Sequence, residues 1–129
     1  MDLIIETDIG RDPDDFFAIC YLAAAGVNIR AILISPGDPD QVAITRLLCD
    51  RIGLDVPIGV AKAGRDKRSS GSIHYDLLKK YKRPLEAKAD GLGVEVVRDV
   101  LGLYPDSELF VIGPVTSIGN YWRGEGWEG

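Results

Sequence analysis

The fold is decided by the stretch Leu3-Ile4-Ile5-Glu6-Thr7-Asp8-Ile9-Gly10-Arg11-Asp12-Pro13-Asp14-Asp15-Phe16-Phe17. It opens with a short apolar run rich in isoleucine, which favours a buried strand. It then passes through an acidic, glycine-containing turn to a proline and two acids, a pattern typical of the start of a helix. A strand followed directly by a helix begins a βαβ unit, so these residues predict a parallel sheet.

The same alternation of strand and helix continues along the chain. Further strands are expected at 29–34, 56–60 and 109–112. Helices are expected at 13–25, capped by Asp12 and closed by Gly26; at 39–52, closed by Gly53; at 74–81; and at 91–104, capped by Asp90. We predict an α/β fold: an open, mostly parallel, Rossmann-like sheet of about four strands with flanking helices. We expect residues 1–122 to form one domain and the glycine-rich residues 123–129 to form a frayed tail.

Composition narrows the class of protein. The chain has 129 residues and a formal net charge of −5, which argues against a nucleic-acid partner. No apolar run is long enough to span a bilayer, and the first residues lack the pattern of a secretory signal. Cys20 and Cys49 lie in apolar helical patterns and are expected to be free thiols rather than a disulfide. We therefore expect a cytoplasmic protein with no membrane partner.

The first turn carries an unusual concentration of acids. Asp8, Asp12, Asp14 and Asp15 fall within eight residues, and crowded carboxylates repel one another unless a cation compensates them. Hard oxygen ligands without nearby His or Cys suit Ca²⁺, or less well Mg²⁺, and disfavour zinc. In the alternative interpretation, Asp12 caps the helix and Asp14 and Asp15 complement its dipole. That alternative leaves Asp8 unexplained.

Two other turns are expected to meet the acidic one. Residues 35–40 and 113–117 also follow predicted strands. Ligands of open parallel sheets bind beyond the carboxyl ends of the strands, so all three turns would line one edge.

Four motifs, in order along the chain, resemble those of the inosine-uridine preferring nucleoside hydrolase family. They are Glu6-Thr7-Asp8-Ile9-Gly10-Arg11-Asp12-Pro13-Asp14-Asp15-Phe16-Phe17-Ala18-Ile19, Ser35-Pro36-Gly37-Asp38, Asp90-Gly91-Leu92-Gly93 and Ile112-Gly113-Pro114-Val115-Thr116-Ser117-Ile118. The family's versions read D-T-D-P-G-x-D-D-x-x-A-I, a turn ending in Gly-Asn, D-G-L-G, and I-G-P-L-T-N-I. The chain thus resembles a truncated relative that corresponds to the N-terminal part of the family.

The resemblance implies calcium-dependent hydrolysis of the N-glycosidic bond of a ribonucleoside. By motif, Asp8 and Asp15 would ligate calcium, and the backbone carbonyl of Thr116 would be a third protein ligand. Asp12 is a further candidate ligand. Asp8 would also be the base that takes a proton from the attacking water.

The resemblance assigns the sugar to two further aspartates. Asp14 would hold a ribose hydroxyl, and Asp38 stands where the family has an asparagine that helps to bind the sugar. The substrate would be a nucleoside or ribose.

The chain departs from the family in ways that keep other functions open. Family members are longer, and their second half supplies another aspartate ligand and usually a histidine that assists the departing base. His74 is expected to be a solvated surface residue away from the site. The alternatives are a non-catalytic module that binds metal or ribose, and an inert structural remnant. Whichever of these functions holds, we expect the chain to self-associate as a homodimer, because a truncated sheet leaves edges uncovered.

Overall fold

The computed structural model describes residues 1–10 and 12–124. The strands are β1 (Asp2–Thr7), β2 (Asn28–Ile34), β3 (Ile58–Val60), β4 (Gly91–Leu92) and β5 (Glu108–Val111). The helices are α1 (Asp14–Ala24), α2 (Pro39–Ile52), α3 (Ser72–Lys80), α4 (Gly93–Leu103) and α5 (Thr116–Gly124). Strand and helix alternate throughout, as the sequence predicts.

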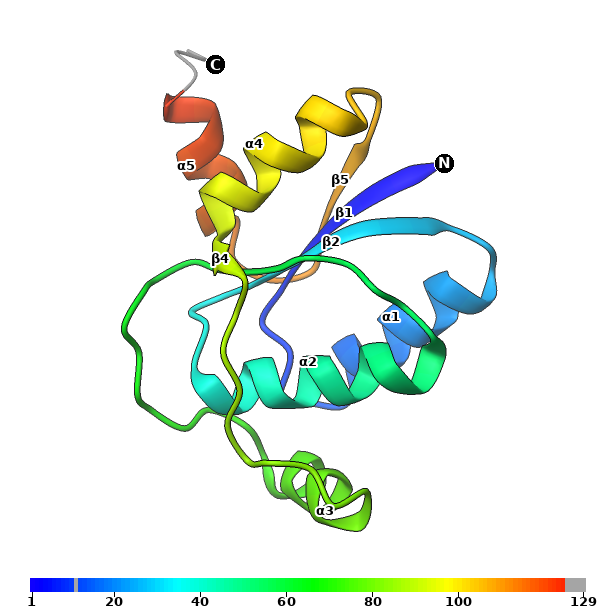
Figure 1. The fold of residues 1–129 in the computed structure, drawn as a ribbon, viewed down its shortest axis with the longest axis vertical. Helices are drawn as coiled ribbons and strands as arrows, with labels where there is room; N and C mark the ends of the chain where they lie inside the picture. The colour runs from blue at the N-terminus through cyan, green and yellow to red at the C-terminus, as the bar shows by residue number, and fades with distance from the viewer. Residues whose placement is uncertain (11, 125–129) are drawn as a thin grey trace.

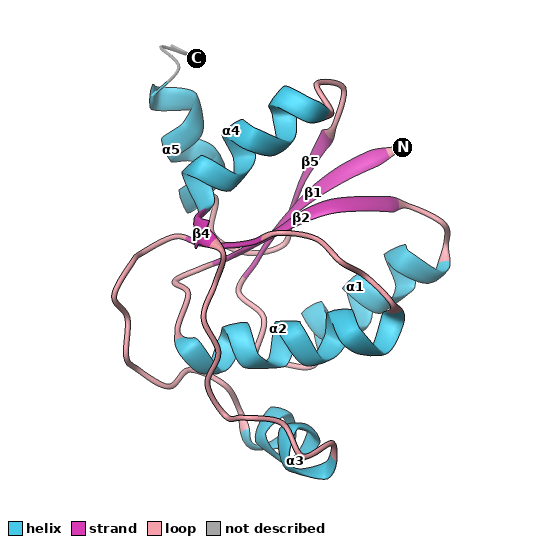
Figure 2. Cartoon of the chain, viewed as in Figure 1, coloured by secondary structure: helices cyan, strands magenta, loops and turns pink. Residues whose placement is uncertain are grey.

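The strands form one open sheet in the order β4-β3-β2-β1-β5, and every pairing is parallel. Figures 1 and 2 show α1 and α2 on one side of the sheet and α4 and α5 on the other. The predicted Rossmann-like α/β class is confirmed. The sheet has one strand more than the four expected, because β4 is only two residues long and gives no apolar run to recognise.

Alternate residues of the central strands supply two separate apolar layers. On one side Ile5 and Ile32 pack among residues of α1 and α2. On the other side Ile4 and Leu33 pack against Val97 of α4 and its neighbours. Since every central strand is covered on both faces, its residues must be apolar in succession, which is why the strands lack a clear polar alternation.

Two helices begin differently from the prediction. The N-cap of α1 is Pro13, with no capping side-chain hydrogen bond, so the predicted capping role of Asp12 is wrong. The N-cap of α4 is Leu92. Asp90 instead accepts a hydrogen bond from the Ile58 N–H (2.8 Å), because β4 intervenes before the helix. By contrast, α2 begins and ends as predicted, with Gly53 closing it at φ 69°.

The C-terminal helix runs further than expected. It includes Arg123 and Gly124, which we had assigned to the frayed tail. The remainder of that predicted tail, 125–129, lies outside the described residues. Within 1–10 and 12–124, no helix combines the length and apolar character needed to cross a bilayer.

Candidate functional site

The acidic first turn lies at the point where the sheet reverses its strand order. β1 pairs with β2 on one side and with β5 on the other, and the chain leaves β1 and β5 toward opposite faces of the sheet. In open α/β sheets the crevice at such a switch point is where ligands bind. A ligand-binding site is therefore expected at the turns after β1 and after β5.

Asp8 and Asp15 come together at this switch point. The Thr7 hydroxyl donates to Asp15 Oδ2 at 2.5 Å and also accepts the Ile9 N–H at 3.1 Å, which links the end of β1 to the first turn of α1. Burial raises the pKa of the Asp15 carboxyl, the Thr7 hydroxyl opposes that rise, and the neighbouring Asp8 carboxylate adds to it. Among the described residues no cationic side chain pairs with either carboxylate, and two close carboxylates favour a proton or a cation.

The turn after β5 lies against the same residues. A Cβ atom on Gly113 would come within 2.6 Å of the Asp8 backbone nitrogen, so the two turns are in contact and only glycine fits. Glu6, fully buried, accepts hydrogen bonds from the Ser117 N–H (2.9 Å) and the Ile118 N–H (3.2 Å). The first turn of α5, which begins at Thr116, is thus held beside β1.

Glu6 is a positioning residue that sequence reasoning overlooked. Burial raises the pKa of its carboxyl, and the backbone N–H groups of Ser117 and Ile118 oppose that rise. A glutamate within an otherwise apolar central strand was the available signal, since a buried carboxylate must find donors.

The second turn, after β2, carries Asp38 at the same edge of the sheet. Asp38 is fully buried. Arg65 Nε donates to Oδ1 at 2.7 Å, Arg65 Nη2 donates to Oδ2 at 3.3 Å, and the Ser69 hydroxyl also donates to Oδ2. The carboxylate predicted to bind sugar is therefore occupied by the loop that follows β3.

Asp40 anchors the same loop. Its Oδ2 accepts hydrogen bonds from the Ser69 N–H (2.8 Å), the Ser70 N–H (2.9 Å) and the Tyr75 hydroxyl (2.7 Å). Together, Asp38 and Asp40 hold residues 65–75 across the edge of the sheet.

Gln41 joins the first and second turns. Its Oε1 accepts the N–H groups of Gly37 and Asp38, at 3.0 and 2.8 Å. Its Nε2 donates to the carbonyls of Ile9 and Ser35, at 3.0 and 3.1 Å. The position of this glutamine, three residues after Asp38 at a helix start, is typical of a capping box and was the signal for its role.

The prediction that His74 is a solvated surface residue is wrong. Its side chain is buried, and its ring meets that of Phe16 edge-on at 6.3 Å. Burial lowers the pKa of His74, and the charge of Asp12 opposes that shift. His74 and Leu78 lie four residues apart and are the two buried residues of α3, a spacing that could have indicated a shared buried face.

The remaining predicted site residues stand apart from this network. Asp12 and Asp14 are exposed at the start of α1. Within the described parts of the chain, no three His, Cys, Asp or Glu side chains gather as a metal site. A metal at Asp8 and Asp15 would therefore need backbone and water oxygens to complete its shell.

A comparison with protein-family models found no match to the chain. A comparison with curated proteins also found none.

Proposed function

We propose that the chain binds a divalent cation, Ca²⁺ rather than Mg²⁺, between Asp8 and Asp15, and hydrolyses the N-glycosidic bond of ribonucleosides there. The observation that carries the proposal is the contact between the acidic first turn and the Gly113 turn at the switch point of the sheet. The sequence motifs that suggest the family lie on these two turns. Their contact supports the proposal that both candidate ligand segments serve one ion.

The residues present suit a hard cation. The raised pKa of Asp15 reflects burial and the neighbouring Asp8 carboxylate, and a cation would remove that repulsion. Two carboxylates and the Thr116 carbonyl offer about three to five of the six to eight oxygens that calcium prefers. Water would supply the rest, so the affinity should be weak, with a Kd of about 10⁻⁴ to 10⁻³ M.

The proposed roles of the side chains come from the resemblance, and their exposure is compatible with these roles. Asp8 is exposed at the end of β1, where its carboxylate can accept a proton from an attacking water. Asp14, exposed in the first turn of α1, is free to meet a ribose hydroxyl. A cation here would lower the pKa of a bound water and orient the diol. Carboxylates beside the sugar would stabilise the positive charge that develops as the bond to the base breaks.

Calorimetric titration with CaCl₂ tests the cation. We expect binding in the wild type, and at least a tenfold loss of affinity in Asp8→Asn and Asp15→Asn. Asp106→Asn, an exposed aspartate before β5, is the matched control and should bind as the wild type does. Equal binding in all four proteins would place the ion elsewhere.

A reducing-sugar assay with inosine and uridine tests the reaction. Release of ribose that depends on calcium and falls at least about 100-fold in Asp8→Asn is expected, the scale of losing a general base. Activity unchanged in Asp8→Asn would mean contamination or another site.

The bonds of Asp38 favour a second candidate, a non-catalytic module that binds metal and ribose. Because Arg65 and Ser69 occupy that carboxylate, one of the sugar contacts expected from the family is already taken. Calcium and ribose binding without release of ribose from either nucleoside would support this candidate over the hydrolase. If the chain binds no calcium, both candidates are wrong, and the remaining hypothesis is an inert structural remnant.

We also propose that the chain self-associates as a homodimer. β5 is an edge strand, and Phe110 and Val111 on it are exposed. An uncovered edge of this kind invites pairing with a second copy. Sedimentation that shows only monomer at high concentration would contradict the homodimer.

The free thiols support a cytoplasmic location for the protein. Cys20 and Cys49 are unpaired, and burial raises the pKa of Cys49 to about 11. Buried, unreactive thiols are usual in the reducing cytoplasm.

A further inference from the structure

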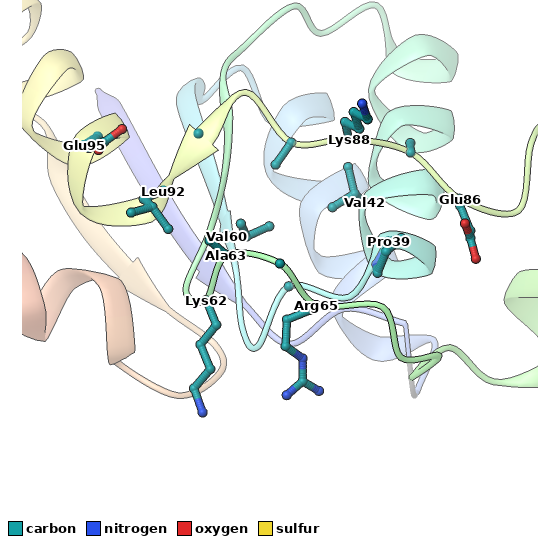
Figure 3. Close-up of a pocket in the computed structure, with 15 residues that line it drawn as sticks. Pro39, Val42, Val60, Lys62, Ala63, Arg65, Glu86, Lys88, Leu92 and Glu95 are labelled. Atoms are coloured by element: carbon teal, nitrogen blue, oxygen red, sulfur yellow. The ribbon is translucent and has the colours of Figure 1, made fainter.

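A separate cavity lies further along the same edge of the sheet. It has a volume of about 800 Å³ and opens between the end of β3, the following residues 61–65, and the segment that leads into β4. Figure 3 shows it between Val60, Leu92 and the start of α2. None of the carboxylates of the candidate metal site lines it, so it is a different site.

The inner surface of the cavity is apolar. Val42 of α2, Val60 of β3 and Leu92 of β4 form its floor, with Ala63 at its side; Ala87 also lines it. The volume falls within the range of about 300 to 1,000 Å³ that is usual for pockets that hold small ligands. Such a floor suits a flat apolar body, because burial of apolar surface supplies most of the binding free energy.

One end of the cavity is cationic. Lys62 and Arg65 extend side by side from the residues that follow β3 (Figure 3). The bonds of Arg65 to Asp38 use Nε and Nη2, so the guanidinium is held in one orientation without involving Nη1. Lys62 takes part in none of the ion pairs found within 1–10 and 12–124. The charge of Arg65 is balanced by Asp38, so Lys62 supplies the excess positive charge, and Arg65 Nη1 offers an oriented hydrogen-bond donor. Together they suit an anionic group.

The acids in the cavity wall come from other segments. Glu86 precedes β4 and Glu95 lies on α4, and Lys88 in the same wall partly offsets their charge. The end formed by Lys62 and Arg65 therefore differs in charge from the rest of the wall.

We propose that this cavity binds a small organic anion. Its planar apolar body would lie on Val42, Val60 and Leu92, and its carboxylate, sulfonate or phosphate would lie between Lys62 and Arg65. Binding needs no divalent cation and does not rest on the proposed hydrolase activity.

Two fluorescent probes of similar shape test the charge preference. 8-Anilinonaphthalene-1-sulfonate is anionic, and N-phenyl-1-naphthylamine is its neutral counterpart. Lys62→Gln should weaken binding of the anionic probe by about fivefold, the scale of one partly exposed charge pair, and leave the neutral probe unchanged. Lys79→Gln on α3, outside the cavity, is the matched control and should change neither.

A bulky substitution tests the location. Ala63 is exposed at the side of the cavity, so Ala63→Trp should fill it without unfolding the chain and reduce binding of both probes at least tenfold. Ala24→Trp, exposed at the end of α1, should leave both unchanged. Far-ultraviolet circular dichroism confirms that each variant is folded.

Three results would overturn the proposal. Wild-type affinity of the anionic probe in Ala63→Trp would place the probe elsewhere. Equal weakening of both probes in Lys62→Gln would remove the claim about charge. Loss of the anionic probe in Asp8→Asn, or on removal of calcium, would merge the cavity with the candidate metal site.

Discussion

Two acidic turns lie at one edge of the sheet, and they differ in how their charge is balanced. In the second turn, Asp38 and Asp40 are fully buried, and each accepts several hydrogen bonds from the loop after β3. In the first turn, Asp8 and Asp15 lie together with one hydroxyl, that of Thr7, donating to Asp15. In the second turn, the charge of Asp38 is balanced by Arg65, whereas Asp40 accepts hydrogen bonds through Oδ2 alone. For Asp8 and Asp15 of the first turn, the described residues form no ion pair.

This difference separates structural carboxylates from candidate functional ones. Arg65 supplies the counter-charge of Asp38, so that carboxylate needs no metal ion to balance it. No arginine or lysine forms an ion pair with Asp8 or Asp15 among the described residues. The cation proposed for the first turn would supply positive charge there, and the predictions below test that contrast.

The largest effect is expected when the second turn loses its counter-charge. Arg65→Ala leaves the fully buried Asp38 carboxylate without its cation and should lower the free energy of unfolding more than any other change described below. Urea denaturation measures this change. Arg68→Ala, exposed in the same loop, should change it by less than about 0.5 kcal/mol. Similar losses in both variants would mean that the Asp38 pair has no special role.

Separation of the two turns that meet at the switch point should have the next largest effect. Gly113→Ala places a Cβ atom within 2.6 Å of the Asp8 nitrogen and should cost about 1 to 3 kcal/mol, as overpacking does. It should also weaken calcium binding.

Gly102→Ala is the matched control for Gly113→Ala. A Cβ atom at Gly102, within α4, meets nothing within 4 Å. This variant should be more stable than the wild type by about 0.5 to 1 kcal/mol. A Gly113→Ala variant as stable as the wild type would contradict the close contact between the turns.

Removal of one charge from the first turn should stabilise the chain when calcium is absent. Asp15→Asn keeps an oxygen to accept from Thr7 but removes the repulsion from Asp8. The gain should be on the order of 1 kcal/mol at neutral pH, because unit charges about 4 Å apart interact by about that much in water. Saturating calcium should reverse the order of the two proteins. If calcium-free Asp15→Asn is less stable than the calcium-free wild type, the Asp8 and Asp15 carboxylates do not repel each other in the folded chain.

The smallest effect concerns pH. Folding raises the pKa of Asp15 above its ordinary value of 3.8. The folded state therefore binds the proton of Asp15 more tightly than the unfolded state does. The stability that Asp15 contributes is therefore fully present below pH 3.8 and is lost as the pH rises through its folded pKa. The advantage of Asp15→Asn should grow over the same interval, in urea titrations at successive pH values. An advantage independent of pH would exclude Asp15 as its source.

Much of the fold followed from local sequence signals. The proline after Asp38 and the glycine at position 53 marked both ends of α2, because these residues act through their own backbone geometry. The prediction that Asp12 caps α1 was wrong because the N-cap is the next residue, Pro13. In sequence, an aspartate at the N-cap and one just before it cannot be told apart. Strand β4 could not be found, since two residues carry no periodicity.

The candidate site was predictable only as far as the residues that make it. Position after a strand was enough to place Asp8 and the Gly113 turn at one edge. The partners of Asp38 could not be foreseen, because Arg65 and Ser69 reach it from a loop whose path depends on long-range packing. The burial of His74 similarly depends on how α3 packs against α2 and Phe16. The metal and substrate roles remain predictions.

Anomalous diffraction from crystals grown with CaCl₂ tests the central claim most directly. The account predicts a calcium peak about 2.3 to 2.6 Å from oxygens of both Asp8 and Asp15, and from the Thr116 carbonyl, that disappears in crystals of Asp8→Asn. A well-ordered first turn with no peak at saturating calcium, or a peak that contacts neither aspartate, would contradict it.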